Sequence, residues 1–579
     1  MAQKSKPRTP QKSSYRGFEG VDLKKTHSGD ESIALIDNFR ITDDGSLKKR
    51  QGFKKIYENK EKTSPLSASY SLLENGVEVC YFTQGSYVKK YRSDTQEVIN
   101  VGSVKSEATN IFFFEFMNSL YICDGYQILT IKNNSLFYSK FYVPLYGKDW
   151  GIFGGEVYEK PNLLWPKIAI SYKLSEDFAS YLSLGNLNIK SIDAVYRNGA
   201  ALPSDKYYYH EEYNAITVLE FDKDDFFFAI LTIVPDENYL TEQEALFNST
   251  HTSLFPELNE NNLFFWGSKS SNSVFFSTSI TPDSAKLTDN FTSHSRFYIP
   301  IGSYFSVASA EDRIKAFTRH YDRVLIMTDS STWITNLRDL ETNSMMIKNI
   351  NSSIGCEVAN GCVRIENTIF SIGKDAIYAW TADTDELNEC NAYSISEPIK
   401  DLLGKDFYSS CLIHLNYAKR EIWFFSPTQS QTWIYSYTNK KWYSFSGFTP
   451  TAFLDGGDEV RFLEDKILYA FDKDLRSDIR NKGEAEITAT LKSGMLEFNS
   501  ERKKKLSSAT VRGSLEGGSL ELNVMLDEKR RITYPISPSA HHSVISFRIK
   551  SGSFRYMTFE LTAKGKGEQI IHGIELNAD

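Results

Sequence analysis

IFFFEFMNSLYICDGYQILTI, residues 111–131, shows most clearly the pattern from which the fold is inferred. Its apolar residues form three runs of strand length, separated by short polar turns. The pairs Asn118-Ser119 and Asp124-Gly125 lie where tight hairpin turns are expected, because Asn, Asp and Gly tolerate positive φ angles. The stretch therefore predicts an antiparallel meander.

Similar meanders recur along the chain. They read RIKAFTRHYDRVLIMTDSSTWITNL from Arg313, CVRIENTIFSIGKDAIYAWT from Cys362, KREIWFFSPTQSQTWIYSYTNKKWYSF from Lys419 and VRFLEDKILYAFDK from Val460. One apolar residue in the middle strand of each meander serves as a marker: Val79, Leu120, Leu263, Val324, Ile369, Ile422 and Ile467. The distance from one marker to the next is 41 to 61 residues in all cases but one. A four-stranded propeller blade takes about 40 to 50 residues. The sequence therefore predicts an all-β protein built on a β-propeller of about seven blades, with a range of six to eight.

The exceptional step, 143 residues from Leu120 to Leu263, is too long for one blade and predicts an inserted small β-domain, in which Asn198-Gly199 is a strong hairpin signal. After about Asp478, long alternating strands predict a C-terminal β-domain. Short helices are expected over 241–247 and 397–404. The expected domains are a flexible basic N-terminal arm and hairpin (1–60), first propeller blades (61–160), the inserted β-module (161–245), the remaining blades (246–480) and the C-terminal β-domain (481–579).

Composition and charge limit the function classes. Aromatic residues make up 14% of the chain, with 33 Tyr and 39 Phe, which favours strands. The net charge of −8 opposes general nucleic-acid binding, although walls that do not hold phosphates would suit DNA in transit. No run of eighteen apolar residues and no apolar leader occurs, so we expect a protein made and kept in a cytoplasm. The flexible arm is expected from five basic residues without an acidic one: Lys4, Lys6, Arg8, Lys12 and Arg16.

Motifs of catalytic and metal sites are not evident. The six cysteines contain no CxxC pair, and His210-Glu211-Glu212 lacks the second His of a zinc-protease motif. Asp329 to Trp333 is similar to part of a sialidase aspartate box but lacks its Gly, so we expect Asp329 to close a turn and Trp333 to pack. We therefore predict no catalytic residue, no cofactor and no metal site.

One basic run has two interpretations. Residues 502–505 are Arg502, Lys503, Lys504 and Lys505. A run of this kind is most often a solvated strand end, and contact with a neighbouring subunit is the alternative.

The N-terminal segment carries a family resemblance. Residues 17–57 read GFEGVDLKKTHSGDESIALIDNFRITDDGSLKKRQGFKKIY. This segment resembles the opening of the short-tailed phage nozzle proteins, the tail tubular protein B type and related tail-hub or stabilisation proteins. Gln51 stands where many relatives carry Pro, a departure within a turn. The residues that carry the resemblance are Asp37, Asn38, Phe39, Arg40, Asp44, Gly45, Arg50 and Gly52.

Weaker likenesses extend over most of residues 17–480, as in YEKPNLLWPKIAISY and IFSIGKDAIYAWT. The resemblance implies a non-enzymatic ring subunit, usually of a hexamer, that extends the DNA-ejection channel below the portal and adaptor rings and contacts other tail proteins. Duplex DNA would pass without sequence-specific binding, in a virion tail assembled in the host cytoplasm. The alternative is a glycan-binding or glycan-cleaving tail-tip propeller acting on the host surface. Cleavage would need a carboxylate pair, and acidic residues are too plentiful to single one out.

Overall fold

The computed structural model describes residues 11–579 outside a set of short segments. The described residues are predominantly strands in many small sheets, so the all-β prediction is confirmed. Lys4, Lys6 and Arg8 of the predicted arm lie outside the described residues. The segments that are not described are 26–31, 59–65, 106–109, 174–179, 223, 257, 259–261, 269–270, 293–295, 310, 338–339, 341–344, 382–390, 455–458, 482, 499–501 and 537–542.

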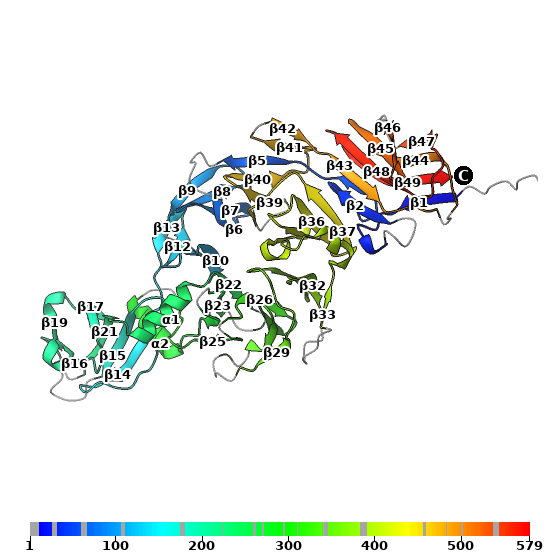
Figure 1. Cartoon of the computed structure of the whole chain (residues 1–579). Coiled ribbons are helices and arrows are strands. Elements are labelled where there is room, and N and C mark those ends of the chain that lie inside the picture. Colours follow the sequence, from blue (N-terminus) through cyan, green and yellow to red (C-terminus); the bar gives the residue numbers. More distant parts are fainter. Residues whose placement is uncertain are drawn as a thin grey trace, which may run out of the picture. The chain divides into compact units, whose positions relative to one another are not determined.

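The chain divides into two compact units, which are described separately. Unit 1 comprises Met1–Asn100, Cys356–Asp383 and Glu389–Asp579, and unit 2 comprises Val101–Gly355 and Thr384–Asn388. Figure 1 labels the elements of both units.

Unit 1 contains four-stranded antiparallel meanders. One sheet has the order β6 (Leu66–Glu74), β7 (Val77–Gln84), β8 (Tyr87–Arg92) and β9 (Val98–Ser103). A second has the order β30 (Cys362–Ile365), β31 (Thr368–Ile372), β32 (Ile377–Trp380) and β33 (Ala392–Ser394). A third run, β34 (Leu412–Asn416), β35 (Glu421–Phe425), β36 (Gln431–Ser436) and β37 (Lys441–Ser446), forms one edge of a larger sheet.

A strand from the N-terminal region completes a further meander of unit 1. β38 (Ala452–Leu454), β39 (Arg461–Glu464) and β40 (Ile467–Phe471) pair in sequence, and β5 (Phe53–Glu58) pairs antiparallel with β40. β41 (Ser477–Arg480) and β42 (Gly483–Glu486) extend this sheet beyond β5. Phe53 at the start of β5 is fully buried, and its ring meets those of Phe448, Phe462, Tyr469 and Phe471 edge-on at 5.2 to 6.1 Å. This aromatic packing holds β5 in place.

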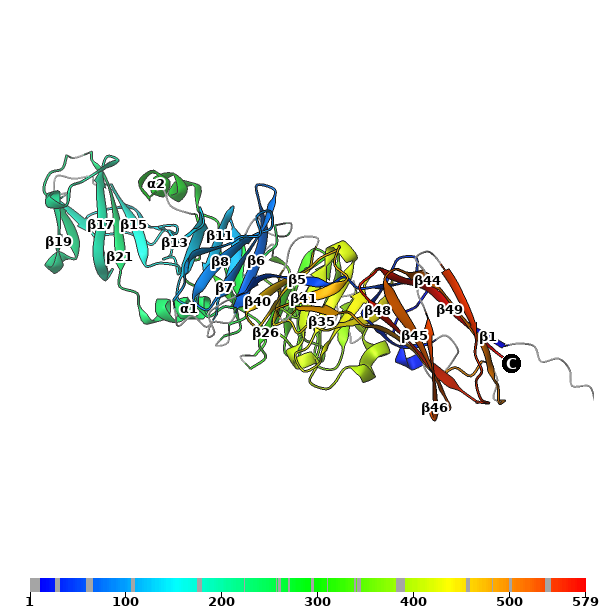
Figure 2. The same cartoon turned by 90° about the horizontal axis from the view of Figure 1, so that it is seen from above.

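The C-terminal β-region is built from both ends of the chain. β2 (Ile33–Asp37) lies between β37 and β43 (Ala489–Ser493), and the sheet continues through β48 (Met557–Gly565), β45 (Gly518–Leu526) and β46 (Arg530–Ile536). A second sheet has the order β3 (Phe39–Ile41), β4 (Leu47–Lys49), β49 (Gln569–Ala578), β44 (Leu506–Leu515) and β47 (Ser543–Arg548). Figure 2 shows β44 and β49 as a layer facing β45 and β48. Buried aliphatic and aromatic side chains of both sheets belong to one core.

The expectation of a flexible arm is wrong for its last residues. Gln11–Arg16 form β1, which pairs antiparallel with β49 from Gln11 opposite Ala578 to Arg16 opposite Gly573. Tyr15 is buried, and its ring meets that of Phe559 at 5.3 Å. Strand pairing and the burial of Tyr15 supply the stabilisation that the polar composition of this segment cannot supply alone.

Unit 2 contains three more meanders of the same kind. Their strands, in spatial order, are β10 (Phe112–Phe116), β11 (Ser119–Cys123), β12 (Ile128–Lys132) and β13 (Ser135–Tyr138); β22 (His251–Leu254), β23 (Leu263–Trp266), β24 (Ser273–Phe276) and β25 (Tyr304–Ser306); and β26 (Ile314–His320), β27 (Arg323–Thr328), β28 (Thr332–Thr335) and β29 (Ile347–Asn351).

Two further sheets of unit 2 occupy the region of the expected insertion. One has the order β14 (Leu145–Trp150), β15 (Lys167–Lys173), β21 (Phe226–Ile233), β17 (Ile189–Arg197) and β18 (Ala200–Ala201). The other has the order β16 (Tyr181–Ser183), β20 (Ala215–Val218) and β19 (Tyr207–His210). The first of these sheets therefore begins at Leu145, before residue 161, where the inserted β-module was predicted to begin.

Helices are few in the part of the chain that the structure describes. α1 (Glu237–Phe247) covers the helix expected over 241–247, and its N-cap Asp236 accepts a hydrogen bond from the Tyr239 amide at 2.7 Å. α2 (Pro282–Thr292) was not predicted, and its Phe291 stacks on Phe228 of β21 at 4.3 Å. The segment expected as a helix over 397–404 is the 3-10 helix η5 (Glu397–Leu402). Further 3-10 turns include η6 (Tyr408–Ser410) and η7 (Tyr417–Lys419). No helix among the described residues has the length and apolarity to cross a membrane.

Candidate functional site

Asp37, Asn38 and Arg50, three of the residues that carry the family resemblance, meet in a polar junction of unit 1 that is centred on Asn38. Asn38 separates β2 from β3 and has a φ of 57°, a left-handed conformation that Asn tolerates better than most residues. Its side-chain amide donates to the Ser446 hydroxyl and the Thr488 carbonyl, both at 2.9 Å. Its side-chain oxygen accepts from the Ser446 amide at 2.9 Å and from Arg50 at 2.7 Å. Asn38 therefore links three distant parts of the sequence.

Arg50 is the cation of the junction and is almost completely buried, with 2% of its side chain exposed. Its guanidinium forms a two-pronged ion pair with Asp478 of β41 at 2.7 and 2.8 Å. It also donates to the Asn38 side chain at 2.7 Å and to the carbonyls of Gln51 and Ser446 at 2.9 Å. All five N–H groups of the guanidinium are thus satisfied inside the protein, as a buried charge requires.

Asp37 is the second carboxylate of the junction and is half-buried. It accepts hydrogen bonds from the hydroxyls of Ser444 at 2.9 Å and Ser446 at 2.6 Å. Burial raises the pKa of the Asp37 carboxyl, and the hydroxyls of Ser446 and Ser444 and the charge of Arg50 counteract part of that rise. This carboxylate fastens the end of β2 to β37.

Arg40 forms a second ion pair, with Glu421 of β35. The two groups contact at 2.5 and 3.2 Å, and the Arg40 guanidinium lies 5.4 Å from the ring of Phe445. Glu421 also accepts from the Tyr443 hydroxyl at 2.6 Å and from the Trp423 indole at 2.8 Å. Burial lowers the pKa of Arg40, but the charge of Glu421, together with Tyr443 and the hydrogen bonds to both residues, offsets this and raises the pKa overall. Burial, and then the charge of Glu421, raises the pKa of Tyr443, so its phenol keeps its proton and donates.

Steric contacts explain why two of the resemblance residues, Gly45 and Gly52, are glycines. Gly45 has a φ of 78°, and a Cβ there would lie 2.8 Å from the Gly17 Cα. A Cβ on Gly52 would lie 1.8 Å from the Ser477 carbonyl oxygen, so only glycine lets this segment approach β41. Asp44 fixes the turn before Gly45, because its carboxylate accepts from the Thr42 hydroxyl at 2.5 Å and from the Ser46 amide at 3.1 Å. Phe39 is fully buried in the core.

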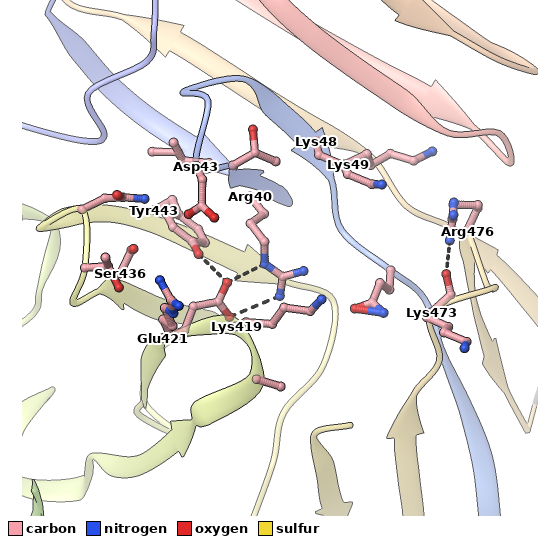
Figure 3. Close-up of a pocket in the computed structure, with 17 residues that line it drawn as sticks. Arg40, Asp43, Lys48, Lys49, Lys419, Glu421, Ser436, Tyr443, Lys473 and Arg476 are labelled. Carbon is pink, nitrogen blue, oxygen red and sulfur yellow. Dashed lines mark hydrogen bonds and ion pairs between the residues drawn. The ribbon is translucent and has the colours of Figure 1, made fainter. Parts of the chain in front are cut away.

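A pocket of about 490 Å³ adjoins this junction within unit 1. Figure 3 shows Arg40, Glu421 and Lys419 on one side and Lys48, Lys49, Lys473 and Arg476 on the other. Arg420 also lines the pocket. Among the described residues, the carboxylates that line the pocket are those of Glu421 and Asp43. The arrangement concentrates positive charge in a protein whose net charge is −8.

The four residues of the predicted contact run, 502–505, differ in exposure. Arg502, Lys503 and Lys505 are exposed, but Lys504 is only 3% exposed and its ammonium donates to the Glu497 carbonyl at 2.5 Å. Lys504 therefore serves packing within its own chain, while a subunit contact through the other three stays a prediction.

Sequence reasoning missed the partners of the junction and most of the pocket cations. Glu421 had a detectable signal, because an acidic residue in the apolar strand EIWFF must be paired if that strand is buried. Asp478 and the serines of β37 gave no comparable signal. Among the described residues, no three His, Cys, Asp or Glu side chains are grouped to hold a metal ion.

Comparisons with known proteins give no family. No protein-family model and no curated protein matches the chain. Among solved structures, an AfRom2 CNH domain aligns at a TM-score of 0.35 and 7% identity, covering 73% of this chain and 99% of that one. A mitotic checkpoint complex aligns at 0.33 and 9%, covering 82% and 96%. An exo-beta-1,3-galactanase from Phanerochaete chrysosporium aligns at 0.24 and 8%, covering 88% and 95%. At these scores none of the likenesses carries an argument.

Proposed function

We propose that this chain is a structural subunit of a phage tail nozzle or hub ring that extends the DNA-ejection channel below the portal and adaptor. The observation that carries the proposal is that the segment with the family resemblance is bound to distant strands of its own chain. Asn38, Arg50 and Gly52 tie the N-terminal segment to β37 and β41, more than 390 residues later in the chain. Buried packing and paired charges suit a structural protein, and the resemblance to the nozzle proteins indicates which kind of structural protein.

The repeated meanders support a propeller as the body of this subunit. Among the described residues, both units contain four-stranded antiparallel runs of the kind that the sequence spacing interprets as blades. β5 pairs with β40, so a strand from the N-terminal region completes a meander formed by β38, β39 and β40. We propose that these runs are blades arranged radially, because pairing of first and last strands is the way in which such a ring avoids an open edge.

The proposed assembly is a homo-oligomeric ring, a hexamer as the resemblance implies. It would contact the portal or adaptor ring and other tail proteins, and DNA would pass in transit without sequence-specific binding. The negative net charge supports this role, since a wall that repels phosphates does not retain DNA. We propose no enzymatic activity and no cofactor, and a location in the virion tail after assembly in the host cytoplasm.

Native mass measurement and electron microscopy of purified tails test the proposal. The expected result is about six copies of the chain around a central channel wide enough for duplex DNA. A persistently monomeric chain that is absent from virions would refute the proposal.

An exposed aromatic cluster favours glycan binding as a second candidate function. Tyr181 of β16 and Tyr208 of β19 are 37% and 49% exposed, and Tyr213, which ends the 3-10 helix η3 (Glu211–Tyr213) between β19 and β20, is 60% exposed. The rings of Tyr213 and Tyr181 lie 5.6 Å apart, and His210 lies 4.6 Å from Tyr213. Exposed tyrosines offer an apolar ring face together with a polar tip, a combination that suits a sugar ring.

Incubation with host surface polysaccharide tests this second candidate. Tyr208→Ala with Tyr213→Ala should abolish binding, whereas Tyr417→Ala, at a tyrosine of unit 1 that is 69% exposed, should not. Release of reducing ends would add cleavage to binding. Absence of binding by the unmodified chain would dismiss the candidate.

A further inference from the structure

We propose that the cationic pocket beside the junction binds a multivalent phosphate, either free or at the end of a nucleic-acid strand. The proposal does not rest on the assembly role, because it follows from the lining of one cavity within unit 1. Seven cationic side chains face two carboxylates there (Figure 3).

One of these two carboxylates is already neutralised. Glu421 is paired with Arg40 and accepts from Tyr443 and Trp423, so its capacity to offset further charge is small. Asp43 then remains against six cations of the pocket. Lys48 and Arg476 share Glu568 outside the pocket lining, at 2.5 and 3.4 Å. The pocket keeps a positive excess after these pairs are formed.

Lys49 lines the pocket as a buried cation. It is 3% exposed, and its ammonium donates to the neutral Gly565 carbonyl. Burial is the main cause that lowers the pKa of Lys49; Glu486 opposes it, the charges of Arg476 and Arg50 add to it, and the pKa falls to about 8. An anion in the pocket would relieve this unfavourable environment.

Two lysines are available for a ligand. Lys419 and Lys473 are exposed, and neither forms an ion pair with a described residue. Lys419 ends η7, whose N-cap Asn416 accepts from the Lys419 amide at 3.2 Å. Lys473 lies in a turn where its carbonyl accepts from Arg476 at 2.5 Å. Short, hydrogen-bonded turns therefore hold both lysines in the lining of the pocket.

Size and charge favour phosphate over the other anions. The volume of about 490 Å³ falls within the range of small-ligand pockets, about 300 to 1,000 Å³, and is too small for a duplex. A carboxylate brings one charge, whereas a phosphate monoester brings about −1.5 to −2 and several acceptor oxygens. Guanidinium and ammonium groups on opposite walls match a ligand with acceptors in several directions.

Isothermal titration of the full chain at low salt tests the proposal with inorganic tripolyphosphate as the probe. One equivalent should bind saturably, and Lys419→Gln with Lys473→Gln should weaken binding by about tenfold or more, given charge-assisted contacts. Lys374→Gln with Lys405→Gln, at exposed lysines outside the pocket lining, makes the same change in net charge and should leave the affinity unchanged. Circular dichroism should be the same for both variants.

Two further probes identify the source of the phosphate. Binding of a 5′-phosphorylated oligonucleotide, but not of its unphosphorylated form, would support a nucleic-acid end as the ligand, and binding of tripolyphosphate alone would support a free phosphate. The proposal is overturned if no probe binds saturably, if both double variants lose affinity equally, or if a tetraglutamate peptide binds as tightly as tripolyphosphate.

Discussion

Replacement of Arg50 by Met removes the cation of the buried junction and leaves its partners in place. The Asp478 carboxylate, with 6% of its side chain exposed, would lose both prongs of its ion pair at 2.7 and 2.8 Å. The carbonyls of Gln51 and Ser446 would each lose a donor. Removal of one partner of a buried ion pair costs about 3 to 5 kcal/mol, because the remaining charge is uncompensated. We expect a loss of this size in the free energy of unfolding of unit 1.

Hydrogen exchange measured by mass spectrometry across a urea series is the appropriate assay, since a chain of two units need not unfold in one step. Peptides from β35, β37 and β41 report on unit 1, and peptides from β26 and β27 serve as the internal control in unit 2. Protection should fall in the first set and stay unchanged in the second.

Companion variants separate charge from geometry. Arg50→Lys keeps the charge but not the planar fork, so it should lie between the wild type and Arg50→Met. Arg50→Met with Asp478→Leu removes the uncompensated carboxylate and should recover part of the loss. Arg92→Met, which breaks an exposed pair with Asp94, should have little effect. The reasoning is refuted if Arg50→Met costs no more than Arg92→Met, or if the double variant is no more stable than Arg50→Met alone.

Two other predictions concern a steric contact and a buried imidazole. Gly52→Ala should destabilise unit 1 by about 3 kcal/mol in urea denaturation, because its Cβ meets the Ser477 carbonyl, whereas Gly151→Ala, with nothing within 4 Å, should be nearly neutral. His251 stacks on Trp266 at 4.6 Å, and burial lowers its pKa to about 4. The unfolded chain binds this proton near pH 6.5, so unfolding free energy should fall by up to about 3 kcal/mol as pH drops from about 6.5 to about 4. In the His251→Phe variant, hydrogen exchange of β22 peptides should show a smaller decrease in unfolding free energy as the pH drops. An unchanged pH dependence would contradict the assignment of this effect to His251.

Local features of the fold were predictable because they depend on neighbouring residues. Asn198 and Gly199 have φ angles of 50° and 85° and form the two-residue turn between β17 and β18 that their types predict. The turn expected at Asn118-Ser119 lies one residue earlier, since Phe116 pairs with Ser119 and Met117 joins Asn118 at positive φ. Strand existence follows from local pattern, but register depends on which face is buried.

The all-β class, the recurrence of the meanders, the turn at Asn198-Gly199 and the phrase around Asn38 follow from the sequence alone, because period-two patterning and turn chemistry act over a few residues. The three-dimensional fold was needed to show that β1 pairs with β49, that Arg50 meets Asp478, and that cations from β4, η7 and the turn after β40 line one pocket. These contacts join residues hundreds of positions apart. Their partners are selected by burial, charge and shape in three dimensions, and neighbouring residues carry no record of that choice.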